Sequence, residues 1–194
     1  AELALIDDIS TQLYADGTGN AGKDLEGLAI AVSRTGTYGG ITRGTDTQGS
    51  SIRAAVENTT GGALSLSQVN ADFGTCTVAR EKPDLISTTQ TLWNRIWERS
   101  QPSERSAPND MRDIGFQVVR FNGADVVVDS HVPSGFLYLL NTKWFELYTH
   151  RKWDFRMRGF MEPTSQQRAI GQIIWWGALI CRAPRLHGVE TGLT

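Results

Sequence analysis

The sequence is poor in the groups that usually carry chemistry. It has only two cysteines, Cys76 and Cys181, which lie far apart in apolar surroundings. Such a pair is neither a disulfide framework nor a metal-binding pattern. A reducing, cytosolic folding environment is the simplest inference.

Long apolar runs and a strong net charge are also lacking. No run approaches the roughly 20 residues that cross a bilayer, and no charged and then apolar leader opens the chain, so export is unsupported. The formal net charge of -2 gives no overall attraction to nucleic acid or to anionic lipid. Any binding to a polyanion must therefore come from a local patch.

Motifs for catalysis are missing as well. There is no Gly-x-Ser-x-Gly elbow, so Ser134 beside Gly135 is interpreted as a turn residue. Helical spacing accounts for Cys76 as a core residue rather than as a thiol nucleophile with His131 or His187. The glycines at 36, 39, 40 and 44 lack the Gly-Lys-Ser/Thr ending of a phosphate loop. We therefore predict no enzyme activity and no cofactor.

The first residues predict an amphipathic helix, because one half of the helical wheel is apolar from Leu3 to Leu13 while Asp7 and Asp8 fall opposite. The helix is already running at residue 1, with no initiator Met and no capping residue. We expect that natural sequence upstream has been removed. Asp16–Asn20 supplies glycines that end the helix.

The next stretch, Gly36–Gly62, is rich in Gly, Thr and Ser and predicts a loop, with a short helix near Ser51–Glu57. Apolar residues then recur at spacings of three and four, which predicts a helix over 66–78 with Ser65 as its N-cap.

A short apolar strand is expected at Asp84–Ser87, followed by a helix capped by Thr88 or Thr89. The polar segment Gln101–Asn109 should break this helix and project into solvent or against another subunit. A strand followed by a helix indicates a mixed α/β lobe.

Strands dominate the closing third. Gln117–Asp129 predicts a hairpin, because Asn122-Gly123 tolerates the positive φ angles of a two-residue type I′ turn. A turn at residues 131–135 separates it from two expected strands, Phe136–Leu140 and Trp144–Tyr148. Ile170–Cys181 is interpreted as one long aromatic strand.

Two clusters in this third have both a chemical and a structural interpretation. Asp125, Asp129 and His131 alternate along a strand and could approach a divalent metal from one face, as in a metal-assisted hydrolase. A solvated strand face ending in a turn explains the same residues, and we favour it.

The second cluster, Arg151–Arg158, mixes basic and aromatic residues and could hold a nucleic-acid backbone. Strand alternation is the favoured interpretation. It places Trp153, Phe155 and Met157 on a buried face and puts the charged residues Lys152, Asp154, Arg156 and Arg158 on a solvated one.

Several short segments occur in one order along nearly the whole chain: Leu13–Thr18, Gly27–Leu28, Gly39–Arg43, Pro83–Ile86, Thr88–Gln90, Phe121–Gly123, Val126–Asp129 and Leu140–Thr142. Trp176-Gly177, Gly188-Val189 and Gly192 continue the series. In these segments the sequence resembles the major capsid proteins of tailed bacteriophages, which have the Hong Kong 97 type of fold.

The resemblance implies an α+β fold with an axial mixed α/β lobe and a peripheral lobe made of a helix end and a long antiparallel sheet. Residues 1–24 would be the end of the long helix of the peripheral lobe. Residues 25–150 would form the axial lobe, and 151–194 the return to the peripheral lobe and its C-terminal strand. The family's N-terminal arm and extended hairpin loop would lie before Ala1.

The implied function is that of a major capsid protein subunit, which self-associates into an icosahedral shell enclosing phage DNA. Its partners would be copies of itself in capsomers, scaffolding or decoration proteins, and packaged DNA through weak nonspecific contacts. No membrane is expected, and the location would be the virion capsid, assembled in the host cytoplasm. A cellular nanocompartment shell is an alternative with the same fold.

Two sets of site residues follow as hypotheses. Glu104, Arg105 and Arg112 would make a contact between subunits, and Lys152, Arg156 and Arg158 would form a basic face toward the shell interior.

Overall fold

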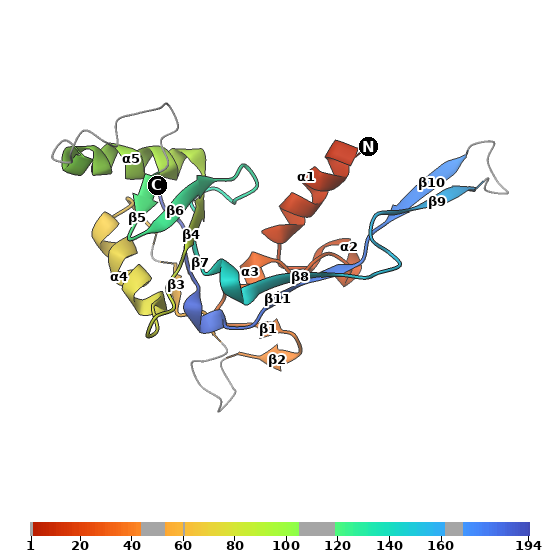
Figure 1. Cartoon of the computed structure of the whole chain (residues 1–194), viewed down its shortest axis with the longest axis horizontal. Helices are drawn as coiled ribbons and strands as arrows, with labels where there is room; N and C mark the ends of the chain where they lie inside the picture. The colour runs from red at the N-terminus through yellow and green to blue at the C-terminus, as the bar shows by residue number, and fades with distance from the viewer. Residues whose placement is uncertain (1, 44–52, 60, 105–118, 162–168) are drawn as a thin grey trace.

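The computed structural model describes residues 2–43, 53–59, 61–104, 119–161 and 169–194. They form a body around a six-stranded sheet and an arm that extends from it (Figure 1). The arm consists of two antiparallel two-stranded ribbons, built from residues 145–161 and 169–181. Among the described residues, no helix has both the length and the apolar character that a bilayer crossing requires.

The sheet of the body is mixed. Its strand order is β3-β12-β7-β4-β6-β5, with the pairs β3/β12 and β4/β6 parallel and the other pairs antiparallel. The prediction of mixed α/β structure is therefore confirmed. The strands are β3 (Val56–Asn58), β4 (Leu85–Thr88), β5 (Val119–Phe121), β6 (Ala124–Val128), β7 (Leu137–Leu140) and β12 (Gly188–Glu190).

Both faces of the central strand β7 are covered, which explains why its residues are all apolar. Leu137 and Leu139 pack under α4 (Leu66–Cys76) and α5 (Gln90–Glu104) on one face. Tyr138 and Leu140 pack on the other face with α3 (Leu28–Ala31) and the residue that follows α1 (Glu2–Leu13), Tyr14. Figure 1 shows the two helix layers on opposite sides of the sheet. Alternate residues of one strand thus serve two cores.

The helix predicted over 66–78 and the helix predicted after Thr88 or Thr89 hold in position and differ at their ends. The helix expected over 66–78 ends at Cys76. Thr89 directly precedes α5, and its carbonyl oxygen accepts the Trp93 N–H at 2.9 Å, as that of an N-cap residue does. The prediction that residues 101–109 break this helix was wrong for the described part, since α5 continues to Glu104.

The hairpin prediction is confirmed. β5 and β6 are joined by Asn122 and Gly123, whose φ angles are 50° and 86°. Positive φ at both positions is the geometry of a type I′ turn.

The glycine-rich segment is partly ordered by pairing. β1 (Thr37–Tyr38) and β2 (Ile41–Thr42) form a small hairpin whose turn glycines also have positive φ. The helix expected near Ser51–Glu57 is wrong where the structure describes it, because Val56 to Asn58 form β3 beside β12. Parallel pairing with a strand far along the chain decides the conformation, and the local pattern does not contain that information.

The long aromatic strand is interrupted. β10 (Ile170–Ile174) pairs with β9 (Arg156–Met161), while β11 (Gly177–Cys181) pairs with β8 (Phe145–Thr149). Between them, Trp175 and Trp176 form a joint. Short 3-10 turns (η3, Thr142–Trp144; η4, Pro184–Leu186) connect the arm to the body.

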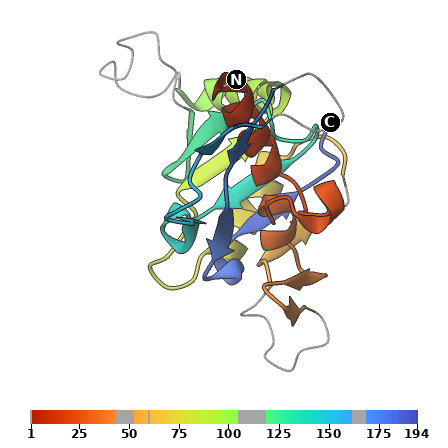
Figure 2. The same ribbon diagram turned by 90° about the vertical axis from the view of Figure 1, so that its right-hand side faces the viewer.

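The helix predicted at the start is confirmed as α1, and a few polar contacts fix it to the body. The Tyr14 hydroxyl lies 2.8 Å from Ser87 Oγ and donates to Asp129 at 2.9 Å. Figure 2, which looks along the arm toward the body, shows α1 in front of the sheet. A four-residue turn that contains left-handed Asn20 and Ala21, α2 (Gly19–Gly22), follows it.

Candidate interaction surface

The arm exposes most of the large apolar side chains that reach the surface. Twelve such side chains are exposed in the described part of the chain, and eight of them belong to the arm or its joint: Leu147, Tyr148, Phe155, Met157, Phe160, Ile173, Trp176 and Ile180. Phe160 is the extreme case, with 70% of its surface exposed. The arm therefore lacks a core of its own.

The outer ribbon, β9/β10, has two different faces. Met157 lies opposite Ile173, while Arg158 lies opposite Gln172 and Arg156 opposite Ile174. Because neighbouring residues of a strand point to opposite faces, Met157 and Ile173 share one face and the two arginines share the other.

A bulge adds a further aromatic to the apolar face. The register shifts between Ile170 and Gln172, which leaves one extra residue on β9. A side chain placed at Gly171, on the same face as Ile173, would contact the Phe160 ring at 3.1 Å and Met157 Cε at 3.6 Å. Phe160 thus lies on the apolar face with Met157.

Aromatic contacts hold the joint between the two ribbons. The Trp153 and Trp176 rings are 5.8 Å apart, and Phe155 lies 6.1 Å from Trp175. The Trp176 N–H donates to the Trp153 carbonyl oxygen at 2.9 Å. A side chain at Gly177 would collide with the Trp175 ring, so this glycine lets the indole lie flat on the backbone. The prediction of a buried face over 151–158 was wrong: Phe155, with φ of 49°, and Met157 are exposed.

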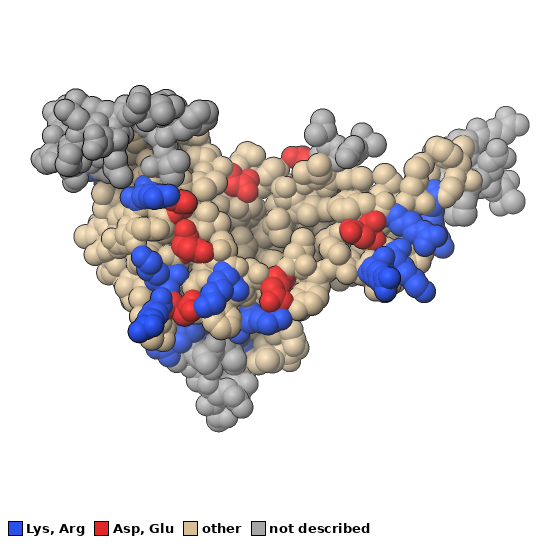
Figure 3. Space-filling model, in the orientation of Figure 1, with Lys and Arg blue, Asp and Glu red and all other residues tan. Residues whose placement is uncertain are grey.

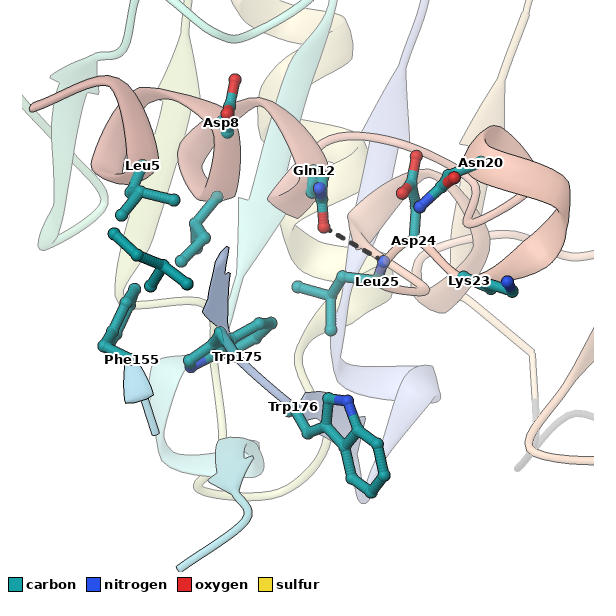
Figure 4. A pocket seen from close by; sticks show the side chains of 13 residues that line it. Leu5, Asp8, Gln12, Asn20, Lys23, Asp24, Leu25, Phe155, Trp175 and Trp176 are labelled. Carbon is teal, nitrogen blue, oxygen red and sulfur yellow. Dashed lines mark hydrogen bonds between the residues drawn. The ribbon is translucent and has the colours of Figure 1, made fainter. Parts of the chain in front are cut away.

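A groove of about 440 Å³ lies between α1 and the arm (Figure 4). Leu5 of α1 and Phe155 of the arm point toward each other across it, with Trp175 and Trp176 along the arm side. Its full lining is Leu5, Asp8, Ile9, Gln12, Asn20, Lys23, Asp24, Leu25, Phe155, Ile173, Trp175, Trp176 and Gly177. The apolar side of the predicted helix therefore lines an open groove and not a closed core.

The opposite side of the arm is basic. Arg151, Lys152, Arg156 and Arg158 are exposed, and none of them is ion-paired with a carboxylate in the described part of the chain. Figure 3 shows Lys and Arg side chains gathered on the arm. The Arg156 guanidinium lies 5.6 Å from the centre of the Trp153 ring. The hypothesis that Lys152, Arg156 and Arg158 form a basic face toward the interior of a shell stays a prediction.

The other predicted contact cannot be placed. Glu104 is the last residue of α5, and Arg105 and Arg112 lie outside the described residues.

Of the three residues of the alternative metal site, the structure brings only Asp129 and His131 into contact. Asp125 is ion-paired with Arg120 at 2.7 Å. His131 lies between two carboxylates instead, with Nδ1 3.0 Å from Asp129 and Nε2 2.8 Å from Asp7 of α1. Within the described ranges, no group of three or more His, Cys, Asp or Glu residues could hold a metal ion.

The His131 contacts tie α1 to the body, and no pattern in the sequence predicted them. Hydrogen bonds to Asp7 and then to Asp129 raise the pKa of His131 above its ordinary value. Burial alone would raise the pKa of Asp129, but hydrogen bonds from His131 and Tyr14 outweigh it and hold that pKa low. Only the doubly protonated ring can donate to both carboxylates.

The sequence analysis also missed a buried acidic pair, Asp72 of α4 and Glu190 of β12. Burial, followed by the charge of Asp72, raises the pKa of Glu190 to about 8. Both line a second cavity of about 510 Å³. Among the described residues that line this cavity there is no Lys, Arg or His. The two acids therefore have no basic side chain to pair with in the described lining.

The cysteine and histidine of the rejected thiol site are core residues. Burial raises the pKa of Cys76 to about 12, and burial lowers the pKa of His187 to about 4. His187 Nδ1 accepts the Asn141 N–H at 3.1 Å. Cys76 is therefore a protonated thiol in the core.

Of three comparisons with known proteins, the one with solved structures found a similar fold. No protein-family description matches the sequence, and no curated protein matches it. Among solved structures, the fold is similar to a chain of the cyanophage A-1(L) capsid asymmetric unit, with a TM-score of 0.71 and 16% identity. The match covers 100% of this chain and 69% of that one. The chain therefore has a fold like that of a phage capsid protein.

Proposed function

We propose that this protein is a major capsid protein subunit of a tailed bacteriophage, of the Hong Kong 97 type, which self-associates into an icosahedral shell around phage DNA. The observation that carries the proposal is the arm. The arm belongs to a chain whose whole length matches the fold of a phage capsid protein. The arm also exposes apolar side chains that need a partner.

The physical argument concerns the stability of a two-stranded ribbon. An isolated ribbon of this kind is marginally stable in water at best, and needs further strands or a packed face. Here eight large apolar side chains lie exposed along two such ribbons. Exposed apolar patches on a folded protein mark interaction sites. Copies of the same chain are the partner that a shell subunit would supply, with many modest contacts adding up in the closed assembly.

We assign the lobes as the sequence suggested. Residues 25–150, which supply five of the six strands of the body's sheet, would be the axial lobe, and residues 1–24 and 151–194 the peripheral lobe. The exception within 151–194 is β12, which pairs with β3 and β7 in the sheet of the body. Glu104, Arg105 and Arg112 would contact a neighbour near the capsomer axis. The protein would then be a structural component of the virion, assembled in the host cytoplasm with scaffolding or decoration proteins as further partners.

Self-association tests the proposal directly. Sedimentation velocity across the micromolar to millimolar range should show oligomers that grow with concentration. Replacing Met157 and Phe160 by serine should reduce this association, while the matched replacement of Val78 and Val127, exposed apolar residues of the body, should not. Negative-stain images of the assembled protein should show shells of uniform diameter. A chain that stays monomeric at every concentration, and forms no shells, would contradict the proposal.

A further inference from the structure

The groove between α1 and the arm combines an aromatic lining with an acidic rim. Phe155, Trp175 and Trp176 supply aromatic rings. Asp8 and Asp24 supply carboxylates, and neither is ion-paired with a cation among the residues that the structure describes. Figure 4 shows both carboxylates above the apolar side chains, that of Asp8 on the upper side of α1 and that of Asp24 beside Asn20.

This combination suits arginine side chains. A guanidinium stacks on an aromatic ring and pairs with a carboxylate in the same site, and the methylene groups of its side chain cover apolar surface. Lys23 also lines the groove, so the charged residues of the lining are two carboxylates and one lysine. The groove is thus a site for a cationic, partly apolar surface.

The basic face of the arm is a surface of this kind, but it cannot reach the groove of its own chain. Arg156 and Arg158 project from the opposite face of the ribbon to Ile173, which lines the groove. The occupant must therefore come from another molecule.

We propose that the groove between α1 and the arm binds the basic face of the arm of a second copy, with Arg156 and Arg158 of one chain against the aromatic lining and Asp8 and Asp24 of the next. The inference rests on the proposed function and specifies which two surfaces meet. Because the groove and the basic face are different surfaces, the contact is head-to-tail. Contacts of this kind close into rings when the rotation between copies permits.

Charge favours a second copy over nucleic acid. A phosphate backbone would also attract the four cations of the arm. However, the chain as a whole has a formal charge of -2, and the acidic α1 segment lies along the same arm. That segment repels a polyanion and attracts the arm of a neighbour.

A charge exchange between the two surfaces tests the inference. Self-association is measured by sedimentation for the unmodified chain and for three variants: Arg156→Glu with Arg158→Glu, Asp8→Arg with Asp24→Arg, and all four changes together. Each pair alone should weaken association about tenfold or more, since it places like charges opposite one another. The four changes together should restore it to within a few-fold of the unmodified chain, because the ion pairs are re-formed with opposite polarity.

A matched control carries the same change in net charge as the variant Arg156→Glu with Arg158→Glu. Arg80→Glu with Arg99→Glu, at exposed positions of the body, should leave association unchanged. Thermal unfolding of each variant should match that of the unmodified chain, since surface substitutions usually change stability by about 0.5 kcal/mol or less.

The outcomes separate the two proposals. If the unmodified chain associates but the fourfold variant is no better than either pair, this contact is wrong while the capsid function stands. If the arginine variant associates normally and instead loses affinity for labelled duplex DNA, the basic face meets nucleic acid and the contact is likewise overturned. An unmodified chain that fails to associate overturns both.

Discussion

The body and the arm are built on different principles. Six strands of the body form one sheet, and helices bury both of its faces. In the arm, each strand of either ribbon has a single partner within the described residues, and the apolar side chains lie open. The body is thus complete as a folded unit, whereas the arm has its apolar surface available to other molecules.

The difference extends to the glycines. A Cβ at Gly27 would lie 2.7 Å from the Ala15 carbonyl oxygen, and closer still to those of Gln12 and Leu13. A Cβ at Gly159 of the arm would meet nothing within 4 Å. Close backbone packing therefore fixes the junction of α1 with the body, while the outer arm has space around it.

The largest expected effect contrasts two apolar truncations. Leu139→Ala, at a fully buried position of β7, should lower the free energy of unfolding by about 2–5 kcal/mol, through lost apolar burial and the cavity left behind. Met157→Ala in the arm should change it by about 0.5 kcal/mol or less, because this side chain is 56% exposed. Urea unfolding measures both. Equal losses would show that the arm is packed as tightly as the body.

The two glycines provide the next contrast. Gly27→Ala should cost about 1–3 kcal/mol, because the new methyl group must displace backbone carbonyls. Gly159→Ala should be close to neutral or slightly stabilising, since it restricts the unfolded chain without a clash. Thermal unfolding of the two variants compares them, and a neutral Gly27→Ala would contradict the close approach of α1.

A pH effect is expected in the body from Glu190. Its pKa in the folded protein is raised, so the folded state holds the proton more tightly than the unfolded state does. The stability that the neutral carboxyl contributes should therefore be complete below its ordinary pKa and be lost as the pH rises through about 8. Calorimetry at about pH 6 and about pH 9 should show a smaller loss for Glu190→Gln than for the unmodified chain. Equal losses would mean that Glu190 is not the group responsible.

The smallest expected effect concerns the attachment of α1. The pKa of His131 is raised in the folded protein, so its contribution is present below the ordinary histidine value and lost as the pH rises through the folded value. The groups that face the ring are Asp7, Asp129 and the Ser130 hydroxyl. Hydrogen exchange of the α1 amides should speed up across this range. In His131→Gln the acceleration from this source should disappear, and its persistence would exclude His131 as the cause.

The residues that carried the resemblance turn out to have physical roles at the junctions. Tyr14 donates to Asp129, and Arg43 donates to the carbonyl oxygens of Ala31 and Ser33 that end α3. Asp84 accepts hydrogen bonds from the Thr142 backbone and side chain. Arg43 and Asp84 satisfy backbone groups, and Tyr14 satisfies the side chains of Ser87 and Asp129, so each of these positions uses a specific polar side chain. For that reason a pattern of scattered short segments was enough to predict the capsid-like fold.

The candidate surface was harder to predict. The basic residues at 152, 156 and 158 were found from alternation, but the same rule placed Phe155 and Met157 in a core that does not exist. Alternation tells which residues share a face, and does not tell whether anything covers it. The groove depends on α1 lying beside β10, residues more than 150 positions apart, and no local signal encodes that approach.

The amino-acid sequence by itself determined the helices of the body, the Asn122-Gly123 hairpin and the capsid-like fold, because periodicity, turn chemistry and junction residues act over short distances along the chain. Tertiary structure alone decided that Val56–Asn58 is a strand, that the aromatic strand breaks at Trp175, that His131 joins Asp7 to Asp129, and that an acidic, aromatic groove lies along the arm. Each of these features requires groups from distant segments to meet, and their energies arise only when the fold brings them together.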